Sequence, residues 1–401
     1  MQTRKSLVIR AAILALLTLS ALELAFQLAF PHLPVAIIEQ MPQFRARMGF
    51  RLDAEHGLQE YPAGEFVNYE ISRSSGDLFK LTCLSPDDAP AFDSYRVSFQ
   101  RDAHGFRNPE PWPDKVQTVI IGDSFTAAEA IVAPYWQGLA DSLLALGLPG
   151  SGALQQQRLL EAFALPREPE LVILAYFAGN DLQDSLTFHR QSQADEGSSS
   201  ATGEQRSPLD YSVLFNIAYA FRSSVLREAE APCHFPQLAQ TEPPTPIAFY
   251  DVFLSSFALD SKTLRESEMF RITREAIGDM ASTLQARGSQ LILMYIPQKA
   301  ELYWELLSDE SKRAIFSGSK VFDASVEMSA VSANLRAQRD LLAELTAGLG
   351  IAFLDLTPAL DDAVSAGEQP YFFADTHWNQ TGHNIARIAL LDFLNQSNLD
   401  M

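Results

Sequence analysis

The stretch VQTVIIGDS, residues 116–124, is a short apolar run that ends in a polar tripeptide. Short apolar runs rich in β-branched residues and bounded by turn-forming residues are typical of strands buried on both faces. Three later stretches repeat this pattern: 171–176 (LVILAY), 290–296 (QLILMYI) and 351–356 (IAFLDL). We therefore predict four buried strands.

Helical patterns lie between and after these strands. They cover residues 135–146, 266–287, 340–349 and 382–395. Buried strands that alternate with helices predict the α/β class, here a three-layer α/β/α sandwich around a parallel, flavodoxin-like sheet. Ligands of such sheets bind beyond the carboxyl ends of the strands. Polar groups follow two of the predicted strands at those ends, Gly122-Asp123-Ser124 and Gly179-Asn180-Asp181.

The composition excludes several classes of protein. Of 401 residues, 47% are apolar and 20% are charged, which excludes a disordered chain, a collagen and a small disulfide scaffold. The formal net charge of −20 argues against binding to phosphate backbones, so we expect no nucleic-acid partner. The two cysteines, Cys83 and Cys233, lie in no zinc-binding pattern. They allow either a single disulfide or two unpaired thiols.

The N-terminus has the pattern of a transmembrane signal anchor. Three basic residues within Met1–Arg10 precede an apolar run over 11–30, which Glu23 and Gln27 interrupt. Twenty helical residues span about 30 Å, the thickness of a hydrocarbon core. The basic flank predicts a cytoplasmic N-terminus. We expect a single-pass anchor over residues 1–30 in the cytoplasmic membrane, with the C-terminal domain on the extracytoplasmic side. A cleaved signal peptide and a buried soluble helix are the alternatives.

A turn-rich lead-in separates this anchor from the main domain. It covers residues 31–115 and contains alternating, strand-like patterns at 66–71 and 95–99. The main domain is predicted over 116–398.

An insertion interrupts the predicted main domain at about 184–264. It contains a polar stretch without periodicity over 190–208, which predicts a flexible surface loop, and a helical pattern near 212–227. The insertion could form a lid or one wall of the active site.

Three residues supply the groups that serine nucleophiles need. Ser124 lies where a buried strand turns toward a helix, so its hydroxyl can be held at the edge of the sheet. A serine nucleophile needs a base that takes its proton and a carboxylate that orients the base. His377 and Asp375 are of these types. Read alone, each has another interpretation: a turn serine, a helix-capping aspartate, or metal ligands together with His383.

Two further positions could stabilise an oxyanion. The Asn180 side-chain amide follows a predicted strand, and an amide aimed at a developing oxyanion lowers the barrier to acyl transfer. Gly150 lies in a flexible loop where a backbone N–H could face the same oxygen. Both positions could instead be ordinary turns.

Together these blocks resemble the SGNH/GDSL hydrolase superfamily. The four motifs are Gly122-Asp123-Ser124, Gly150, Gly179-Asn180-Asp181 and Asp375-x-His377. The resemblance covers about residues 116–398. Two further stretches, DAHGFRN at 102–108 and DTHWNQTGH at 375–383, are similar to membrane-anchored members and to the SGNH-like domains of alginate-type O-acetyltransferases.

The sequence departs from the usual superfamily pattern at two places. The superfamily mostly spaces its last pair as Asp-x-x-His, whereas Ala374 stands at that position here and the acid is Asp375. The Asp-x-His form occurs in the acetyltransferase-like branch, so the departure favours that branch. Ala178 replaces the first glycine of the Gly-x-Asn-Asp pattern. We expect this to be tolerated because Asn180 supplies the chemistry.

The resemblance implies an enzyme that hydrolyses or transfers O-acetyl groups on a cell-envelope or secreted carbohydrate through an acyl-Ser124 intermediate. The implied oxyanion hole consists of the backbone N–H groups of Ser124 and Gly150 and the amide of Asn180. We expect no cofactor and no metal. The implied partners are an acyl-ester or carbohydrate substrate and a membrane-bound acyl-donor protein, and Tyr371 and Trp378 are candidates for stacking on sugar rings.

Two alternatives belong to other functional classes. A non-catalytic SGNH-like protein that binds glycan or scaffolds an envelope assembly would have a misplaced or occluded Ser124–His377 pair. A flavodoxin-like nucleotide binder would need a glycine-rich phosphate loop after the first strand, and the sequence lacks one.

Overall fold

The computed structural model describes most of the chain from residue 94 onward and shorter pieces before it. The described residues are 10, 14, 17–25, 51–52, 58–61, 63–71, 94–197, 234–319, 321–322 and 326–397. The chain divides into two compact units, one made of 1–51 and 198–231 and the other of 52–197 and 232–401. The sheet and all site residues belong to the second unit.

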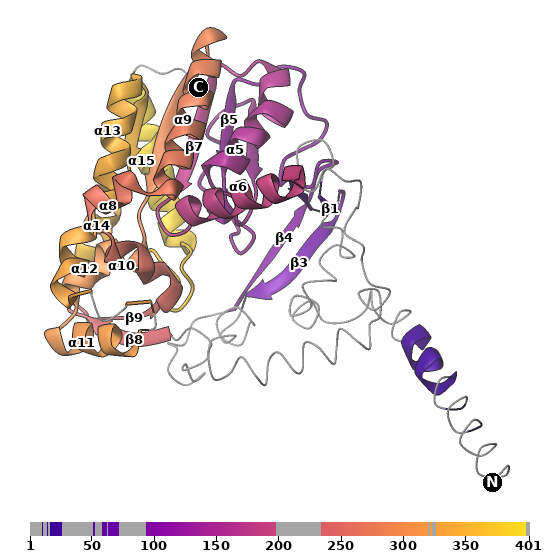
Figure 1. The fold of residues 1–401 in the computed structure, drawn as a ribbon. Coiled ribbons are helices and arrows are strands. Elements are labelled where there is room, and N and C mark those ends of the chain that lie inside the picture. The colour runs from indigo at the N-terminus through magenta and orange to yellow at the C-terminus, as the bar shows by residue number, and fades with distance from the viewer. Residues whose placement is uncertain are drawn as a thin grey trace. The chain divides into compact units, whose positions relative to one another are not determined.

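A five-stranded parallel sheet forms the centre of the second unit (Figure 1). Its strands lie in the order β11 (Ala352–Asp355), β10 (Gln290–Ile296), β7 (Leu171–Phe177), β5 (Thr118–Gly122) and β6 (Leu143–Gly147). All residues of β5 and β7 are buried, as expected for strands with helices on both faces. The predicted α/β class with a parallel sheet is confirmed, and four of the five strands are the predicted ones.

The fifth strand, β6, lies where we predicted a helix over 135–146. Leu143–Gly147 pairs in parallel register with Thr118–Gly122 of β5. At its end a Cβ on Gly147 would lie 2.1 Å from the backbone nitrogen of Ala127, so only glycine allows this close approach. The helix prediction was wrong because a five-residue apolar run fits a buried strand as well as a helical turn.

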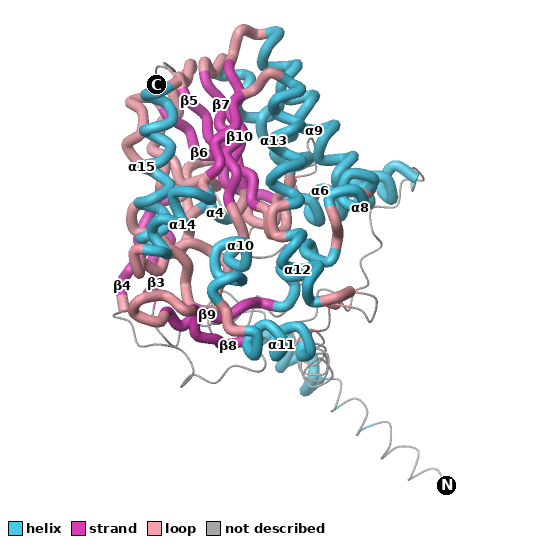
Figure 2. The backbone as a smooth tube through the Cα atoms, turned by 90° about the vertical axis from the view of Figure 1, so that its left-hand side faces the viewer, coloured by secondary structure: helices cyan, strands magenta, loops and turns pink. Residues whose placement is uncertain are grey.

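Helices cover both faces of the sheet. Figure 2 shows α9 and α13 on one side of the strands and α14 and α15 on the other. Alternate residues of each strand enter different cores, Val119 with Val172 on one face and Ile120 with Ile173 on the other. The helices of these layers are α5 (Ala153–Leu159), α9 (Glu268–Ala286), α13 (Ala337–Leu349), α14 (Thr357–Ser365) and α15 (Gln380–Gln396).

Shorter elements complete the described fold of this unit. The helices are α4 (Ser124–Ala127), α6 (Asp181–Gly197), α8 (Ser261–Glu266), α10 (Lys299–Tyr303), α11 (Asp309–Gly318) and α12 (Met328–Asn334). The antiparallel strands β8 (His234–Ala239) and β9 (Thr245–Tyr250) lie in the later part of the insertion. Helix α6 includes residues 190–197, so the loop predicted over 190–208 is wrong for these residues, and 198–208 lie outside the described residues.

The lead-in contains short paired strands. Strands β1 (Arg51–Leu52) and β2 (Gln59–Glu60) form one pair, and β3 (Phe66–Ile71) and β4 (Tyr95–Gln100) form an antiparallel hairpin. The strand-like patterns at 66–71 and 95–99 are confirmed.

The segment between β4 and β5 is fastened to the edge of the sheet. The Asn108 side chain pairs with β6: its Oδ1 accepts from the Ala145 N–H at 2.7 Å, and its Nδ2 donates to the Ala145 carbonyl at 3.1 Å. Asp102 accepts hydrogen bonds from Asn108 and from the Trp112 indole N–H. Asn108 therefore acts as a one-residue extension of the sheet beyond its edge strand.

The single-pass anchor predicted over 1–30 is contradicted, and with it the predicted placement of the domain across a membrane. Among the described residues, no helix combines the length and the apolar character that a bilayer crossing requires.

Two predictions concern residues that the structure does not describe. Cys83 and Cys233, with their alternative states, and the helix near 212–227 all lie outside the described residues.

We expect Asn108→Ala to destabilise the fold by about 2–4 kcal/mol, because it leaves a buried backbone N–H and C=O of β6 without partners. Chemical unfolding followed by circular dichroism measures this free energy. Asn384→Ala, an exposed change on α15, is the matched control and should cost less than about 0.5 kcal/mol. A cost for Asn108→Ala no larger than the control's would contradict the role of this side chain.

Candidate active site

Ser124 lies directly beyond the carboxyl end of β5, as the first residue of α4. Asp123 caps this helix by accepting a hydrogen bond from the Phe125 N–H at 2.9 Å. A Cβ on Gly122 would lie 2.3 Å from the Thr126 hydroxyl, so the turn from strand to helix needs glycine there. The first N–H groups of a helix have no intrahelical acceptor, which leaves the Ser124 backbone N–H available for a ligand.

The structure brings Ser124, His377 and Asp375 into one chain of hydrogen bonds. The Ser124 hydroxyl lies 2.6 Å from Nε2 of His377, and Nδ1 of the same ring lies 2.5 Å from Oδ1 of Asp375. Asp375 and His377 are half-buried. The structure thus brings these three residues together, and their roles as nucleophile, base and orienting carboxylate stay a prediction.

The Asp-x-His spacing has a local explanation. Oδ1 of Asp375 also accepts a hydrogen bond from the backbone N–H of His377 at 2.8 Å. One carboxylate oxygen thus holds both the backbone and the ring of the residue two positions later, as in an Asx-turn. A separation of two residues is therefore sufficient for the carboxylate to orient the imidazole.

The loop that carries this pair is closed at its base. Tyr371 and Trp378 form an isolated antiparallel bridge, and the Phe372 N–H donates to the His377 carbonyl at 3.1 Å. Asn379 caps α15 by accepting from the N–H groups of Thr381 and Gly382. The start of α15 and the bridge together fix where the loop can point.

The charges around Asp375 favour its ionised form. Burial alone would raise the pKa of Asp375, but the charge and the hydrogen bonds of His377, together with the charge of Lys299, lower it below its ordinary value. A carboxylate that stays ionised can hold the imidazole through Nδ1–H and stabilise its protonated form.

Tyr371 and Trp378, our candidates for stacking on sugar rings, lie inside the protein. Both are 0% exposed, and the Tyr371 hydroxyl donates to the Pro297 carbonyl at 2.5 Å. Trp378 packs edge-on against Phe125, with ring centroids 4.9 Å apart. Rings without an accessible face cannot stack on a ligand, so these two residues support the loop from beneath.

Asn180 lies beyond the carboxyl end of β7, the strand next to β5. Its Nδ2 donates to Oδ2 of Asp184 at 2.7 Å. An amide nitrogen has two N–H groups, so one such bond fixes the orientation of the side chain and leaves a second donor. Asn180 is thus at the expected edge of the sheet with its amide orientation set by α6.

The loop around Gly150 lies at the same edge of the sheet. The Leu148 N–H donates to the carbonyl of Gly122 at 2.9 Å, two residues before Ser124. Gly150 is exposed and has φ +70°, a left-handed conformation that favours glycine. This conformation lets the loop turn sharply beside the end of β5.

The DAHGFRN motif contributes a residue whose role we did not predict. Arg107 donates from Nη1 to the carbonyls of Ala128 and Ile131, both at 2.8 Å. Ala128 ends helix α4 in a left-handed conformation. Arg107 therefore holds the segment that follows the Ser124 helix, and the motif before β5 was the sequence signal for it.

The DTHWNQTGH motif holds the same segment from the other side. The Gln380 side chain bonds both the N–H and the carbonyl of Ala133, at 3.0 and 2.7 Å. Nδ1 of His383 accepts from the Tyr135 N–H at 3.2 Å. Burial lowers the pKa of His383 to about 3, which keeps the ring neutral and able to accept. Among the described residues, no group of His, Cys, Asp and Glu could hold a metal ion.

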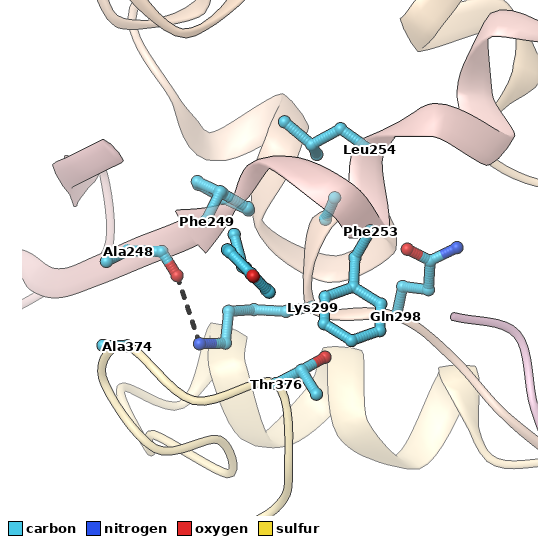
Figure 3. Close-up of a pocket in the computed structure, with 10 residues that line it drawn as sticks. Ala248, Phe249, Phe253, Leu254, Gln298, Lys299, Ala374 and Thr376 are labelled. Atoms are coloured by element: carbon cyan, nitrogen blue, oxygen red, sulfur yellow. Dashed lines mark hydrogen bonds between the residues drawn. The ribbon is translucent and has the colours of Figure 1, made fainter. Parts of the chain in front are cut away.

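The described end of the insertion forms a small pocket beside the loop of Asp375 (Figure 3). Phe253, from the 3₁₀ helix Asp251–Ala258, lies on one side, and Thr376, between Asp375 and His377 in the chain, lies on the other. Lys299 also lines the pocket, and its nitrogen points toward the carbonyl of Ala248. The pocket has room for about one water molecule. The described end of the insertion thus lies beside the loop of Asp375. That the insertion forms one wall of the active site stays a prediction.

Three carboxyl groups near Ser124 and Asn180 hold their protons more tightly than usual. Burial raises the pKa of Asp123 to about 6, against the hydrogen bond from Phe125 and the charge of His377. Burial and then the charge of Asp123 raise the pKa of Asp184 to about 6 and that of Asp181 well above its ordinary value. These shifts come from desolvation of the charged form.

The family comparison agrees with this geometry. Residues 257–400 match the model of the family described as "SGNH hydrolase-like domain, acetyltransferase AlgX". This part of the chain is therefore similar to SGNH hydrolase-like domains. The match contains Asp375 and His377, whereas Ser124, Gly150 and Asn180 precede it and are brought to the same edge of the sheet by the fold. The family supports acyl-ester chemistry and an enzyme as the general class.

The solved structures to which the chain is similar include proteins described as esterases. The acetyl xylan esterase AlAXEase is 12% identical, with 70% of this chain and 100% of that chain covered and a TM-score of 0.34. A mutant of the acetyl-xylooligosaccharide esterase Axe2 from Geobacillus is also 12% identical, with 72% and 98% covered and a TM-score of 0.34. The lipase/acylhydrolase from Enterococcus faecalis is 13% identical, with 70% and 96% covered and a TM-score of 0.30. No curated protein matches the sequence of this chain.

We expect Asp181→Asn to stabilise the protein above pH 6. The folded pKa of Asp181 exceeds the unfolded value of about 4, so the folded state binds the extra proton and wild-type stability falls as the pH rises from there. The amide stays neutral and its oxygen can still accept from Gln156 and the Phe177 N–H, as Oδ2 does now. Thermal unfolding should show a gain of about 1 kcal/mol or more at pH 8 that shrinks toward pH 5.

The control for this prediction is Asp279→Asn, which removes an equal charge from an exposed position on α9. It should leave the pH dependence of stability unchanged. Equal pH dependence of stability in Asp181→Asn and wild type, or a lower stability of Asp181→Asn at pH 8, would contradict the inference that a buried negative charge on Asp181 destabilises the fold.

Proposed function

We propose that this protein hydrolyses or transfers O-acetyl groups on a carbohydrate through an acyl-Ser124 intermediate. The observation that carries the proposal is the continuous hydrogen-bond chain from Ser124 through His377 to Asp375. The family description, which names an acetyltransferase, supports the choice of acyl group.

In the proposed first step, Nε2 of His377 takes the hydroxyl proton of Ser124 while Oγ attacks the ester carbonyl. Asp375 holds the ring through Nδ1–H, so that Nε2 is the basic nitrogen, and stabilises the imidazolium that forms. The imidazolium then gives its proton to the leaving alcohol. Water or a sugar hydroxyl attacks the acyl-serine in the second step, with His377 again as the base.

The oxyanion of each step would be held by the backbone N–H groups of Ser124 and Gly150 and by the second N–H of Asn180. The carboxyl ends of neighbouring strands β5 and β7 supply Ser124 and Asn180, and the Gly150 loop is bonded to the end of β5. Preorganised donors of this kind stabilise the developing charge without reorganisation. The mechanism needs neither a metal nor an organic cofactor. An acyl-carrying protein is a possible donor when the acceptor is a sugar.

The non-catalytic alternative would have a misplaced Ser124–His377 pair. The 2.6 Å distance between the two side chains speaks against that alternative, because a scaffold has no need of a hydrogen-bonded nucleophile and base. We therefore favour the enzyme.

We expect full-length protein to release p-nitrophenol from p-nitrophenyl acetate, and Ser124→Ala and His377→Ala to abolish this activity. Asp375→Asn should lower kcat by on the order of 10⁴-fold because it favours the wrong imidazole tautomer. Activity that survives in Ser124→Ala would overturn the serine mechanism. With an oligosaccharide added, acetylated oligosaccharide in the product would identify a transferase, whereas free acetate alone would identify an esterase.

We expect Asn180→Ala to lower kcat by about 10²–10³-fold with little change in KM, because an oxyanion donor acts mainly in the transition state. Asn180→Asp, which keeps the shape but replaces the donor by a carboxylate, should lose at least as much. Steady-state kinetics on the same ester measure both variants. A KM effect without a kcat effect would instead place Asn180 in substrate binding.

A further inference from the structure

Lys299 is a buried lysine at the candidate site that the proposed mechanism does not use. It is the first residue of α10, three residues beyond the end of β10, and it is 5% exposed. A buried ammonium is costly unless its donors are satisfied and an opposite charge lies nearby. Both conditions are met here.

Three backbone carbonyls accept hydrogen bonds from Nζ of Lys299. They belong to Phe372 at 2.8 Å, Phe373 at 3.0 Å and Ala248 at 3.2 Å (Figure 3 shows the last of these). An ammonium has three N–H donors, so the three carbonyls supply one acceptor for each donor of the charged form. A neutral amine would have only two donors for the three carbonyls.

Two of these carbonyls lie in the loop that carries Asp375 and His377. Phe372 and Phe373 lie three and two residues before Asp375, and the Tyr371 hydroxyl ties the same loop to Pro297, two residues before Lys299. The carbonyl of Phe373 also accepts from the Ala248 N–H at 2.9 Å. The start of α10, strand β9 and the loop therefore converge on one ammonium group.

The charge of Lys299 also acts on the loop. Burial lowers the pKa of Lys299 to about 7, the Asp375 carboxylate opposes this shift, and the lysine in turn lowers the pKa of Asp375. Asp375 is the charged group that faces Lys299 from the elements packed around it.

We propose that Lys299 is a positioning residue for the acyl-transfer site: its ammonium ties two carbonyls of the Asp375–His377 loop to β9 and acts as the counter-charge of Asp375. This inference rests on the proposed function. Lys299 touches neither Ser124 nor the reacting atoms, so its effect is transmitted by the loop.

The test compares Lys299→Met, which keeps the length and apolar body of the side chain, with Lys312→Met. Lys312 is a largely buried lysine on α11 that pairs with Glu305 and so gives a matched loss of charge away from the loop. We expect folded Lys299→Met to lose about 10²-fold in kcat with KM changed less than about threefold, since small misplacements of catalytic groups have effects of this size. Lys312→Met should retain wild-type kinetics. A folded Lys299→Met with kcat within twofold of wild type would overturn the proposal.

A spectroscopic measurement separates this proposal from the proposed function. The Nδ1–H proton of His377, bonded to Asp375, should give a far-downfield proton NMR signal, assigned by its loss in His377→Gln. The signal should persist in Lys312→Met and in Ser124→Ala and be lost in Lys299→Met. An unchanged signal in Lys299→Met overturns the positioning role, whether or not the protein turns out to be an esterase. Ester hydrolysis that survives in Ser124→Ala overturns only the proposed function.

If Lys299→Met does not fold, the pH dependence of kcat in the wild-type protein tests the proposal instead. Loss of the ammonium as the pH rises through about 7 should lower kcat between pH 7 and 9.5. The free energy of unfolding should not fall with it, because a lysine with a folded pKa below its unfolded value makes stability rise with pH in that window. A kcat that stays level from pH 7 to 9.5 would overturn the proposal.

Discussion

One carboxylate oxygen of Asp375 accepts two hydrogen bonds from His377, and the geometry of the whole candidate site depends on this double contact. The backbone bond fixes the turn, and the ring bond fixes the orientation of the imidazole. With both made, Nε2 has a single direction, and Ser124 lies in it at 2.6 Å. Several contacts hold the loop, among them the Tyr371–Trp378 bridge and the hydrogen bonds of the Lys299 ammonium. These contacts therefore also determine the distance between Nε2 of His377 and the Ser124 hydroxyl.

The surrounding motifs hold the segment that follows the helix of Ser124. Arg107 fastens the residues that follow α4, and Gln380 and His383 fasten the next few from the start of α15. The helix that carries Ser124 has only four residues and cannot be stable by itself. Its position is set by these side-chain contacts and by the close approach of Gly147, which explains why so many polar residues around the site have no chemical role.

The sequence was informative where a residue type has few alternatives. Buried apolar strands, Ser124 after β5 and the Asp375–His377 pair could be predicted because each pattern has a direct physical cause. Strand β6 could not, because five apolar residues suit either a strand or a helix, and only pairing with β5 decides between them. Burial was the other obstacle: Tyr371, Trp378 and Lys299 are residue types that often lie at surfaces, and long-range packing places all three inside.

Ionised acidic residues around Ser124 and Asn180 would disfavour the oxyanion of the proposed mechanism, but burial changes their effect. An ionised Asp184 beside Asn180 would repel the developing negative charge, whereas a protonated one would not. Burial raises the pKa of Asp123 and Asp184 to about 6 and that of Asp181 further, so the fold shifts these groups toward their neutral forms. Asp375 is shifted the other way by His377 and Lys299. Carboxyl groups with pKa values moved apart by their surroundings can serve different roles within one site. In the proposed mechanism, Asp375 stays charged and holds His377. Asp123, Asp181 and Asp184 are shifted toward neutral forms, which repel the oxyanion less.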